Sequence, residues 1–204
     1  MIAIIDYGLG NVRAFANVYK KLNMPAIIVK QAENLKNVSK VILPGVGAFD
    51  HAMQRLEQSG MRPFLDEIVL HQHVPVLGIC VGMQMLACSS EEGSLPGLGW
   101  IDGEVKKFNP SSLRHSICVP HMGWNNIKPL KLHGLLKGID LDARFYFLHS
   151  YYFQSHKSDD IIAVTDYDKE FACAVNSGNV FGVQFHPEKS HQWGIRLLEN
   201  FAQL

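Results

Sequence analysis

The fold of this chain is decided by one stretch, Val74-Pro75-Val76-Leu77-Gly78-Ile79-Cys80-Val81-Gly82-Met83-Gln84-Met85-Leu86-Ala87. The run before the first glycine is short and apolar, which is typical of a buried strand. The run after the second glycine consists of good helix formers. Glycines two positions either side of Cys80 permit a sharp turn, because side chains at those positions would crowd it. The stretch therefore predicts a strand that turns directly into a helix, with Cys80 at the turn.

Cys80 in such a turn is a candidate nucleophile. It would lie at the carboxyl end of a sheet and at a helix N-terminus, where the helix dipole favours a thiolate. The N–H of Val81 would be able to point at a developing oxyanion. A buried structural cysteine before an ordinary β–α turn explains the same pattern, and a lone Gly-x-Cys-x-Gly does not separate the two interpretations.

Composition narrows the class of protein. The 19 basic and 19 acidic residues of the 204-residue chain cancel, so neither nucleic acid nor an anionic membrane is indicated as a partner. No apolar run reaches the length of a membrane span, and the N-terminus reads directly as a strand, so we expect no signal peptide. The cysteines lie among apolar residues without Cys-x-x-Cys spacing, which predicts free thiols in the cytoplasm: Cys80, Cys88, Cys118 and Cys173.

Strands and helices alternate up to residue 88. We expect strands at residues 2–6, 26–29 and 41–43, and helices at residues 12–22, 49–59 and 63–71. Asn11 is placed to cap the first of these helices. The alternation predicts a parallel sheet with helices on both faces.

The glycine turn at residues 7–10 is similar to a dinucleotide-binding turn, but two residues argue against that function. Arg13 stands where the third glycine is required, and Lys30 ends the next strand where an acidic ribose ligand belongs. We therefore expect no nucleotide here, and no cofactor or metal elsewhere. The turn is interpreted as structural or as part of a substrate edge.

The second half of the chain reads as antiparallel. We expect strands at residues 104–108, 118–121, 144–153, 161–165, 171–176 and 180–185, with a hairpin at Gly178-Asn179 and a closing helix at 193–201. No repeat or linker interrupts the pattern. Residues 1–204 are predicted to form one domain.

Two further stretches bear on the chemistry of Cys80. In Pro44-Gly45-Val46-Gly47-Ala48-Phe49 the two glycines leave the backbone free to present an N–H outward, although a plain β–α loop has the same pattern. His186 and Glu188 flank Pro187 at a strand end. In an extended segment both side chains project to one side, so Glu188 would orient the imidazole toward Cys80, and Pro187 would disfavour a helical turn. The alternative is a surface ion pair.

The chain resembles the class I, triad-type glutamine amidotransferases. The resemblance rests on Gly78–Gln84, Pro44–Phe49 and Gln184–Glu188, and extends over essentially the whole chain in the order Cys, His, Glu. It implies a flavodoxin-like α/β fold, with a central mixed, largely parallel sheet and helices on both faces, in a single type-1 glutamine amidotransferase domain.

The resemblance also implies an enzyme with a Cys-His-Glu triad that hydrolyses L-glutamine through a thioester. Cys80 would be the nucleophile, His186 the general acid and base, and Glu188 its orienting carboxylate. Oxyanion donors would come from Val81 and from the loop with Val46 and Gly47. The glutamine pocket would be lined by Gln84, Gly47, Ser150 and Tyr151.

Ammonia released into water would be protonated, so its acceptor must lie close, and no segment of this chain is left to form one. Three stretches (residues 4–8, 120–125 and 146–152) most closely resemble glutaminase subunits that form a heterodimer with a (β/α)₈-barrel cyclase of histidine biosynthesis. Such a partner would dock on a surface formed by His121, Met122, Gly123, Trp124 and Asn125. The other interpretation of that segment is a core turn with a buried Trp.

Three alternatives remain open from the sequence. A cysteine peptidase would use the same nucleophile turn, but Gln84 and Pro44–Phe49 argue against it. A non-catalytic binding subunit is disfavoured because all three triad positions are occupied. A paralogous glutaminase that supplies ammonia for surface-sugar synthesis would carry the same motifs, and the sequence does not exclude it.

Overall fold

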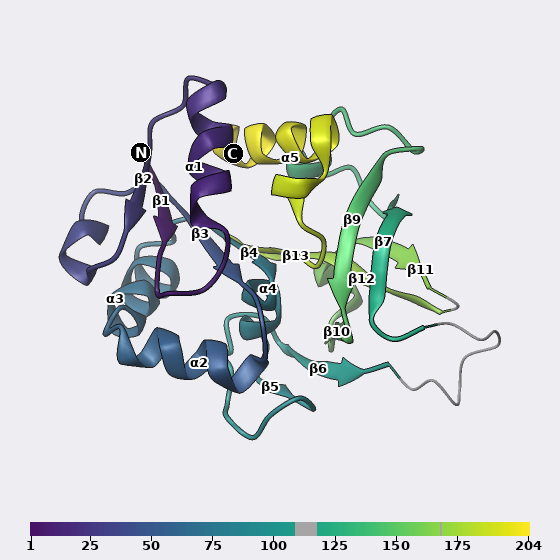
Figure 1. Ribbon diagram of the computed structural model, residues 1–204, viewed down its shortest axis with the longest axis horizontal. Coiled ribbons are helices and arrows are strands. Elements are labelled where there is room, and N and C mark those ends of the chain that lie inside the picture. Colours follow the sequence, from purple (N-terminus) through teal and green to yellow (C-terminus); the bar gives the residue numbers. More distant parts are fainter. Residues whose placement is uncertain (109–117, 168) are drawn as a thin grey trace.

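The computed structural model describes residues 1–108, 118–167 and 169–204 (Figure 1). Its main sheet has a parallel half with the strand order β2-β1-β3-β4-β13. These strands are β1 (Ile2–Ile5), β2 (Ala26–Val29), β3 (Lys40–Gly45), β4 (Val76–Cys80) and β13 (Val180–Val183). β1, β4 and β13 are apolar and buried throughout, as expected of strands that are covered on both faces.

The other half of the main sheet is mostly antiparallel. Beyond β13 the order continues β12-β10-β6-β5, and β11 pairs with both β12 and β8. The strands are β5 (Ser89–Ser90), β6 (Gly103–Lys107), β8 (Lys128–Pro129), β10 (Tyr151–Ser155), β11 (Ile161–Asp166) and β12 (Glu170–Ser177). The prediction of a mixed, largely parallel central sheet is confirmed.

Helices cover both faces of the parallel half. Figure 1 shows α1 (Val12–Lys21) and α5 (His191–Gln203) on one side of the sheet. It shows α2 (Phe49–Gln58), α3 (Arg62–Asp66) and α4 (Val81–Met85) on the other. The Asn11 side chain accepts a hydrogen bond from the Ala14 N–H, so the predicted cap is confirmed. Within the described residues, no helix is long and apolar enough to cross a membrane.

Five short helical turns complete the described elements. They are η1 (Ala32–Leu35), η2 (Glu67–His71), η4 (Gly134–Leu136), η5 (Ser158–Asp160) and η6 (Pro187–Lys189). The helix predicted at residues 63–71 is present, but its second half, η2, is wound as a π-helix.

Two predictions for the antiparallel half were wrong. The single strand expected at residues 144–153 is broken at Ser150 into β9 (Arg144–His149) and β10. β9 leaves the main sheet and pairs with β7 (His121–Asn126) in a separate two-stranded sheet. The strand expected at 118–121 does not form; the chain becomes extended only from His121 onward.

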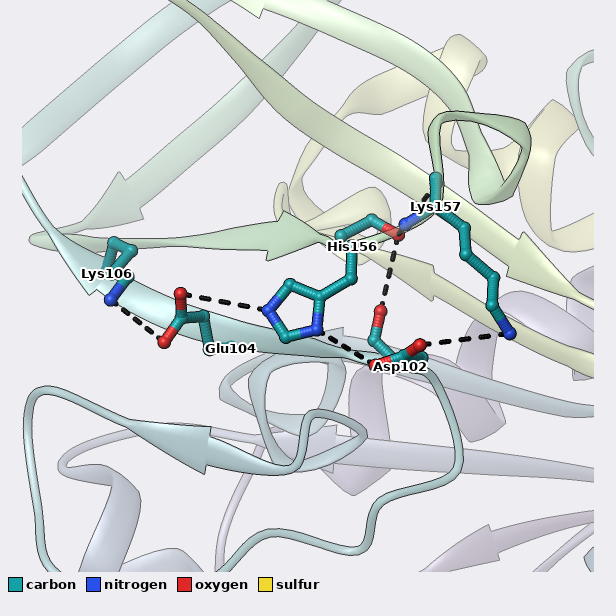
Figure 2. Close-up of polar contacts among 6 residues, drawn as sticks. Asp102, Glu104, Lys106, His156 and Lys157 are labelled. Atoms are coloured by element: carbon teal, nitrogen blue, oxygen red, sulfur yellow. Dashed lines mark hydrogen bonds and ion pairs between the residues drawn. The ribbon is translucent and has the colours of Figure 1, made fainter.

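A network of charged side chains ties β6 to β10 on the surface (Figure 2). The His156 ring lies between two carboxylates, with Nδ1 2.9 Å from Asp102 Oδ1 and Nε2 3.8 Å from Glu104 Oε1. Lys106 pairs with Glu104 at 2.8 Å and with Glu91 at 3.3 Å. The network therefore also holds the loop that follows β5, which contributes to the site described next.

Candidate active site

Cys80 lies at the predicted sharp turn between strand and helix. It is the last residue of β4, and α4 begins at Val81. Its φ and ψ of 56° and −115° are strained for a residue with a side chain, and such strain concentrates at functional sites. The turn presses against the neighbouring strand: a Cβ on Gly82 would lie 2.0 Å from the Leu43 carbonyl oxygen. Only glycine fits there.

His186 and Glu188 meet as the sequence predicted, although the backbone between them does not run as predicted. His186 Nδ1 donates to Glu188 Oε1 over 2.9 Å, and both side chains are buried. We expected Pro187 to disfavour a helical turn, but Pro187 begins the 3₁₀ turn η6. Proline is tolerated at the first position of a helix, where its missing N–H is not needed.

The backbone of His186 is held by β9. Its N–H donates to the Tyr146 carbonyl over 2.8 Å, and its carbonyl accepts from Ser190 Oγ over 2.6 Å. The same Ser190 oxygen accepts from the Tyr146 N–H. Because β13 lies beside β4 in the sheet, these bonds fix the imidazole on the side of Cys80.

Electrostatics couple the three residues. Burial works to lower the pKa of His186, but hydrogen bonds to Cys80 and Glu188, and the charges of both, outweigh it and raise that pKa to about 10. An imidazolium at neutral pH is the counter-ion that a catalytic thiolate needs. A second donor lies near the sulfur: Gln184 Nε2 is 3.8 Å from Cys80 Sγ.

A cavity of about 320 Å³ opens at Cys80. Almost all residues predicted for catalysis, for the oxyanion donors or for the glutamine pocket line it: Val46, Gly47, Cys80, Val81, Gln84, Ser150, Tyr151 and His186. The exception is Glu188, which reaches the cavity only through its hydrogen bond with His186. The sequence interpretation missed five of its lining residues, namely Glu92, Pro120, Leu148, His149 and Lys189.

The loop after β3 forms one wall of this cavity. Gly45, the last residue of β3, is in register with Cys80. Val46 is then 39% exposed, and Gly47 has a φ of +87°, which glycine adopts readily. The loop is therefore placed beside the nucleophile and is free of packing on its outer side.

Buried amide and imidazole groups hold another part of the cavity wall, the Ser150-Tyr151 segment. Gln84 Nε2 donates to the Tyr151 carbonyl over 3.0 Å and to Gln184 Oε1 over 3.1 Å. His149 Nδ1 lies 2.7 Å from the Tyr151 carbonyl oxygen, which only accepts, so Nδ1 carries the proton. Its Nε2 then accepts from His121 Nδ1, 2.9 Å away. These bonds fix the Ser150-Tyr151 segment at the cavity.

Glu92 is a further residue that lines the cavity. Its Oε2 accepts from the Phe49 N–H over 2.8 Å, at the start of α2. Burial, with the nearby charge of Asp50, raises the pKa of Glu92 despite that hydrogen bond. No pattern in the sequence indicated this residue, because its loop meets α2 only through the tertiary fold.

The segment predicted to bind a partner is divided between core and surface. Met122 is 64% exposed and Trp124 is 37% exposed. His121, in contrast, is buried between the rings of Phe147 and Tyr167, so its assignment to a contact surface was wrong. Alternation along β7 explains the division, because successive side chains point to opposite faces.

The remaining cysteines are free thiols. Cys173 is buried, and burial raises its pKa, whereas Cys88 and Cys118 are exposed, contrary to their apolar sequence surroundings. In the part of the chain that the structure describes, no cluster of three or more His, Cys, Asp or Glu residues could hold a metal ion.

Comparison with known proteins agrees with this geometry. The family model for glutamine amidotransferase class-I matches residues 3–204. The chain belongs to the class I glutamine amidotransferase family. As a member of it, the chain is a glutaminase enzyme.

Relatives of this amidotransferase match over their full length. A protein of Bdellovibrio bacteriovorus is 56% identical over 204 residues, which is the whole of both chains, and one of Leptospira interrogans is 52% identical with the same coverage. Both are named imidazole glycerol phosphate synthase subunit HisH.

Solved structures share the fold of the amidotransferase at low identity. A structure described as a glutamine amidotransferase gives a TM-score of 0.72 at 18% identity, covering 100% of this chain and 99% of that one. The structure of PurLQS from Thermotoga maritima gives a TM-score of 0.74 at 14% identity, covering 99% of this chain and 97% of that one.

Proposed function

We propose that this amidotransferase is the glutaminase subunit of imidazole glycerol phosphate synthase, acting through Cys80, His186 and Glu188. The observation that carries the proposal is that the Cys80 sulfur, the His186 imidazole and the predicted oxyanion loop face one cavity. The proposal takes residues 1–204 as one amidotransferase domain. The full-length HisH relatives support the assignment of the pathway.

The first half of the reaction forms a thioester. The Cys80 thiolate attacks the side-chain amide carbon of glutamine, a C–S bond forms, and the carbonyl π electrons move to oxygen. N–H groups of Val81 and of the loop with Val46 and Gly47 stabilise that oxyanion. His186 protonates the amide nitrogen, the C–N bond breaks, and ammonia leaves. Glu188 stabilises the imidazolium and fixes the tautomer of the neutral ring.

The second half regenerates the enzyme. His186, now neutral, removes a proton from water, whose oxygen attacks the thioester carbon. The C–S bond breaks, glutamate leaves, and Cys80 returns to the thiolate beside the imidazolium. No cofactor enters either half.

Glu92 is proposed to bind the α-ammonium of glutamine. Among the described residues that line the cavity it is the only carboxylate. One of its oxygens is engaged by the Phe49 N–H, which leaves the other as an acceptor for a cation. Gln84 acts indirectly, since its amide nitrogen is occupied in holding the Tyr151 wall.

The ammonia is proposed to pass to a (β/α)₈-barrel cyclase in a heterodimer. Met122 and Trp124, exposed on β7, belong to the proposed docking surface, while the buried His121 supports the strand from behind. Pro120, next to this strand, lines the cavity, so a partner on this face would lie close to the released ammonia.

The experiment measures glutamate production by the chain mixed with the histidine-pathway cyclase and its nucleotide substrate, with Cys80→Ala as the matched control. We expect turnover that the variant abolishes. Turnover supported by a surface-sugar barrel and not by the histidine cyclase would assign the chain to the paralogous role. Absence of turnover with either partner would refute the glutaminase proposal.

A further inference from the structure

The turn that follows β1 has no role in the chemistry proposed so far. It contains Tyr7, whose side chain is buried although it lies directly after a strand end. From the sequence, this turn is interpreted as structural or as part of a substrate edge. The contacts of the Tyr7 side chain indicate a more specific role for the turn.

Tyr7 holds the last peptide group before the oxyanion loop. Its hydroxyl donates to the Pro44 carbonyl over 2.7 Å and lies 3.5 Å from Met85 Sδ of α4. That carbonyl belongs to the peptide bond between Pro44 and Gly45. The same turn packs on the proline ring as well: a Cβ on Gly10 would lie 2.8 Å from Pro44 Cβ.

The loop is consequently held at both ends and free between them. At its start, Tyr7 fixes Pro44, and at its end, Glu92 accepts from the Phe49 N–H over 2.8 Å. Between these anchors, Val46 is exposed, and a Cβ on Gly47 would meet no atom of the described residues within 4 Å. Where the loop places its N–H groups therefore depends on the anchors.

Tyr7 is suited to be a permanent donor at this position. Burial, and to a smaller extent the charge of Cys80, raise the pKa of its phenol, so it keeps its proton at any pH at which the enzyme works. Tyr7 is not among the residues that line the cavity, so its hydroxyl acts on the loop and not on the substrate.

We propose that Tyr7 is a positioning residue, which sets the oxyanion loop at the height of the Cys80 sulfur by holding the Pro44 carbonyl. This inference rests on the proposed glutaminase reaction. Because oxyanion donors act on the transition state more than on bound glutamine, loss of the hydroxyl lowers kcat and leaves KM nearly unchanged.

The test deletes one oxygen atom. Tyr7→Phe is compared with Tyr19→Phe, a matched control: Tyr19 is also fully buried and donates to a backbone carbonyl, that of Leu198, over 3.3 Å. Glutamine turnover is measured with the cyclase and its nucleotide substrate. Thermal unfolding is measured for both variants, and Cys80 alkylation by iodoacetamide, which needs no oxyanion hole, is followed by peptide mass spectrometry.

We expect Tyr7→Phe to lower kcat roughly 10- to 100-fold, with KM and the alkylation rate within about twofold of the wild type. Tyr19→Phe should lower stability comparably and leave kcat within about twofold. Equal kcat values for the two variants would overturn the proposal, as would an alkylation rate that falls in parallel with kcat. A wild-type complex without turnover would instead overturn the glutaminase assignment.

Discussion

At the scale of single residues, Glu188 decides which imidazole nitrogen faces the sulfur. Its Oε1 accepts the Nδ1 proton of His186, and its side chain is only 3% exposed. The other nitrogen of the ring is thereby left for Cys80. Because the carboxylate is negative, it also stabilises the imidazolium that the thiolate requires.

Glu188→Gln should lower kcat roughly 10²- to 10⁴-fold, because an amide N–H directed at Nδ1 selects the wrong tautomer and provides no charge. The fold should persist, since the amide has nearly the volume of the carboxylate. Steady-state glutamine hydrolysis and circular dichroism melting check this. Unchanged turnover in a variant of unchanged stability would remove Glu188 from the catalytic group.

Gly82→Ala should both destabilise the protein and impair catalysis. The added methyl would meet the Leu43 carbonyl oxygen at 2.0 Å, a backbone atom that cannot rotate away. We expect a loss of about 1–3 kcal/mol in the free energy of unfolding. The control is Gly134→Ala, whose methyl would meet only the flexible end of Leu204. Urea unfolding of both variants makes the comparison, and equal losses would contradict the steric argument.

Much of this residue-level picture could be predicted, because it is local in sequence. The glycines around Cys80 and the spacing of His186 and Glu188 are short-range patterns. Glu92 could not be predicted, since its partner Phe49 lies 43 positions away and nothing in the Glu91–Leu95 loop marks it. The 3₁₀ turn at Pro187 was misjudged because proline opens such turns as readily as it interrupts longer helices.

At the scale of elements, the break at Ser150 has the largest effect on the site. It separates β9 from β10 and leaves Ser150 and Tyr151 at the cavity. The aromatic residues run through the break without a glycine or proline, so the sequence predicted one strand. β7 was likewise unrecognised, because its Gly123 and two asparagines disfavour strands and only pairing with β9 overrides that preference.

The buried histidines of these elements predict acid sensitivity. Burial lowers the pKa of His121 to about 4, and burial with neighbouring charge lowers that of His149 to about 3. The unfolded chain binds protons on both near pH 6.5, whereas the folded chain does not, so unfolding is favoured increasingly as the pH falls from 6.5 toward 4.

Each of the two histidines can change the free energy of unfolding by about 1.4 kcal/mol per pH unit in that window. His121→Phe keeps a ring between Phe147 and Tyr167 but removes one titrating group, so its slope should be smaller although its overall stability is lower. Urea unfolding between pH 5 and pH 6.5 compares the slopes. Identical slopes for wild type and variant would show that His121 does not titrate as its burial predicts.

At the scale of the whole molecule, the proposed partner explains why the site is open on one side. The oxyanion loop is exposed at Val46, and among the described residues β7 is paired on one edge only, with β9. We expect the isolated chain to be a poor glutaminase and the complex with cyclase and nucleotide ligand to be faster by roughly 10²- to 10³-fold, the rate that one oxyanion donor supplies. Full activity of the isolated chain, unaffected by either addition, would show that the loop needs no partner.

The sequence predicted the parallel half of the molecule better than the antiparallel half for a physical reason. Strands buried on both faces are continuous apolar runs with helices between them, so their order follows from local pattern. Strands of the other half are joined by pairing between distant segments, such as β10 with β6 and β11 with β8. Those pairings are determined by tertiary packing, so a short stretch of sequence contains little information about them.

The position of β13 has a consequence for synthesis of the protein. It lies between β4 and β12 in the middle of the sheet, yet it is the last strand of the chain, and His186 comes shortly after its end at Val183. A nascent chain that still lacks this strand already contains Cys80 and its turn but has no His186 imidazole beside the sulfur. Cys80 is therefore synthesised long before the imidazole with which it acts, and until His186 is added the growing chain lacks the general acid and base of the proposed reaction.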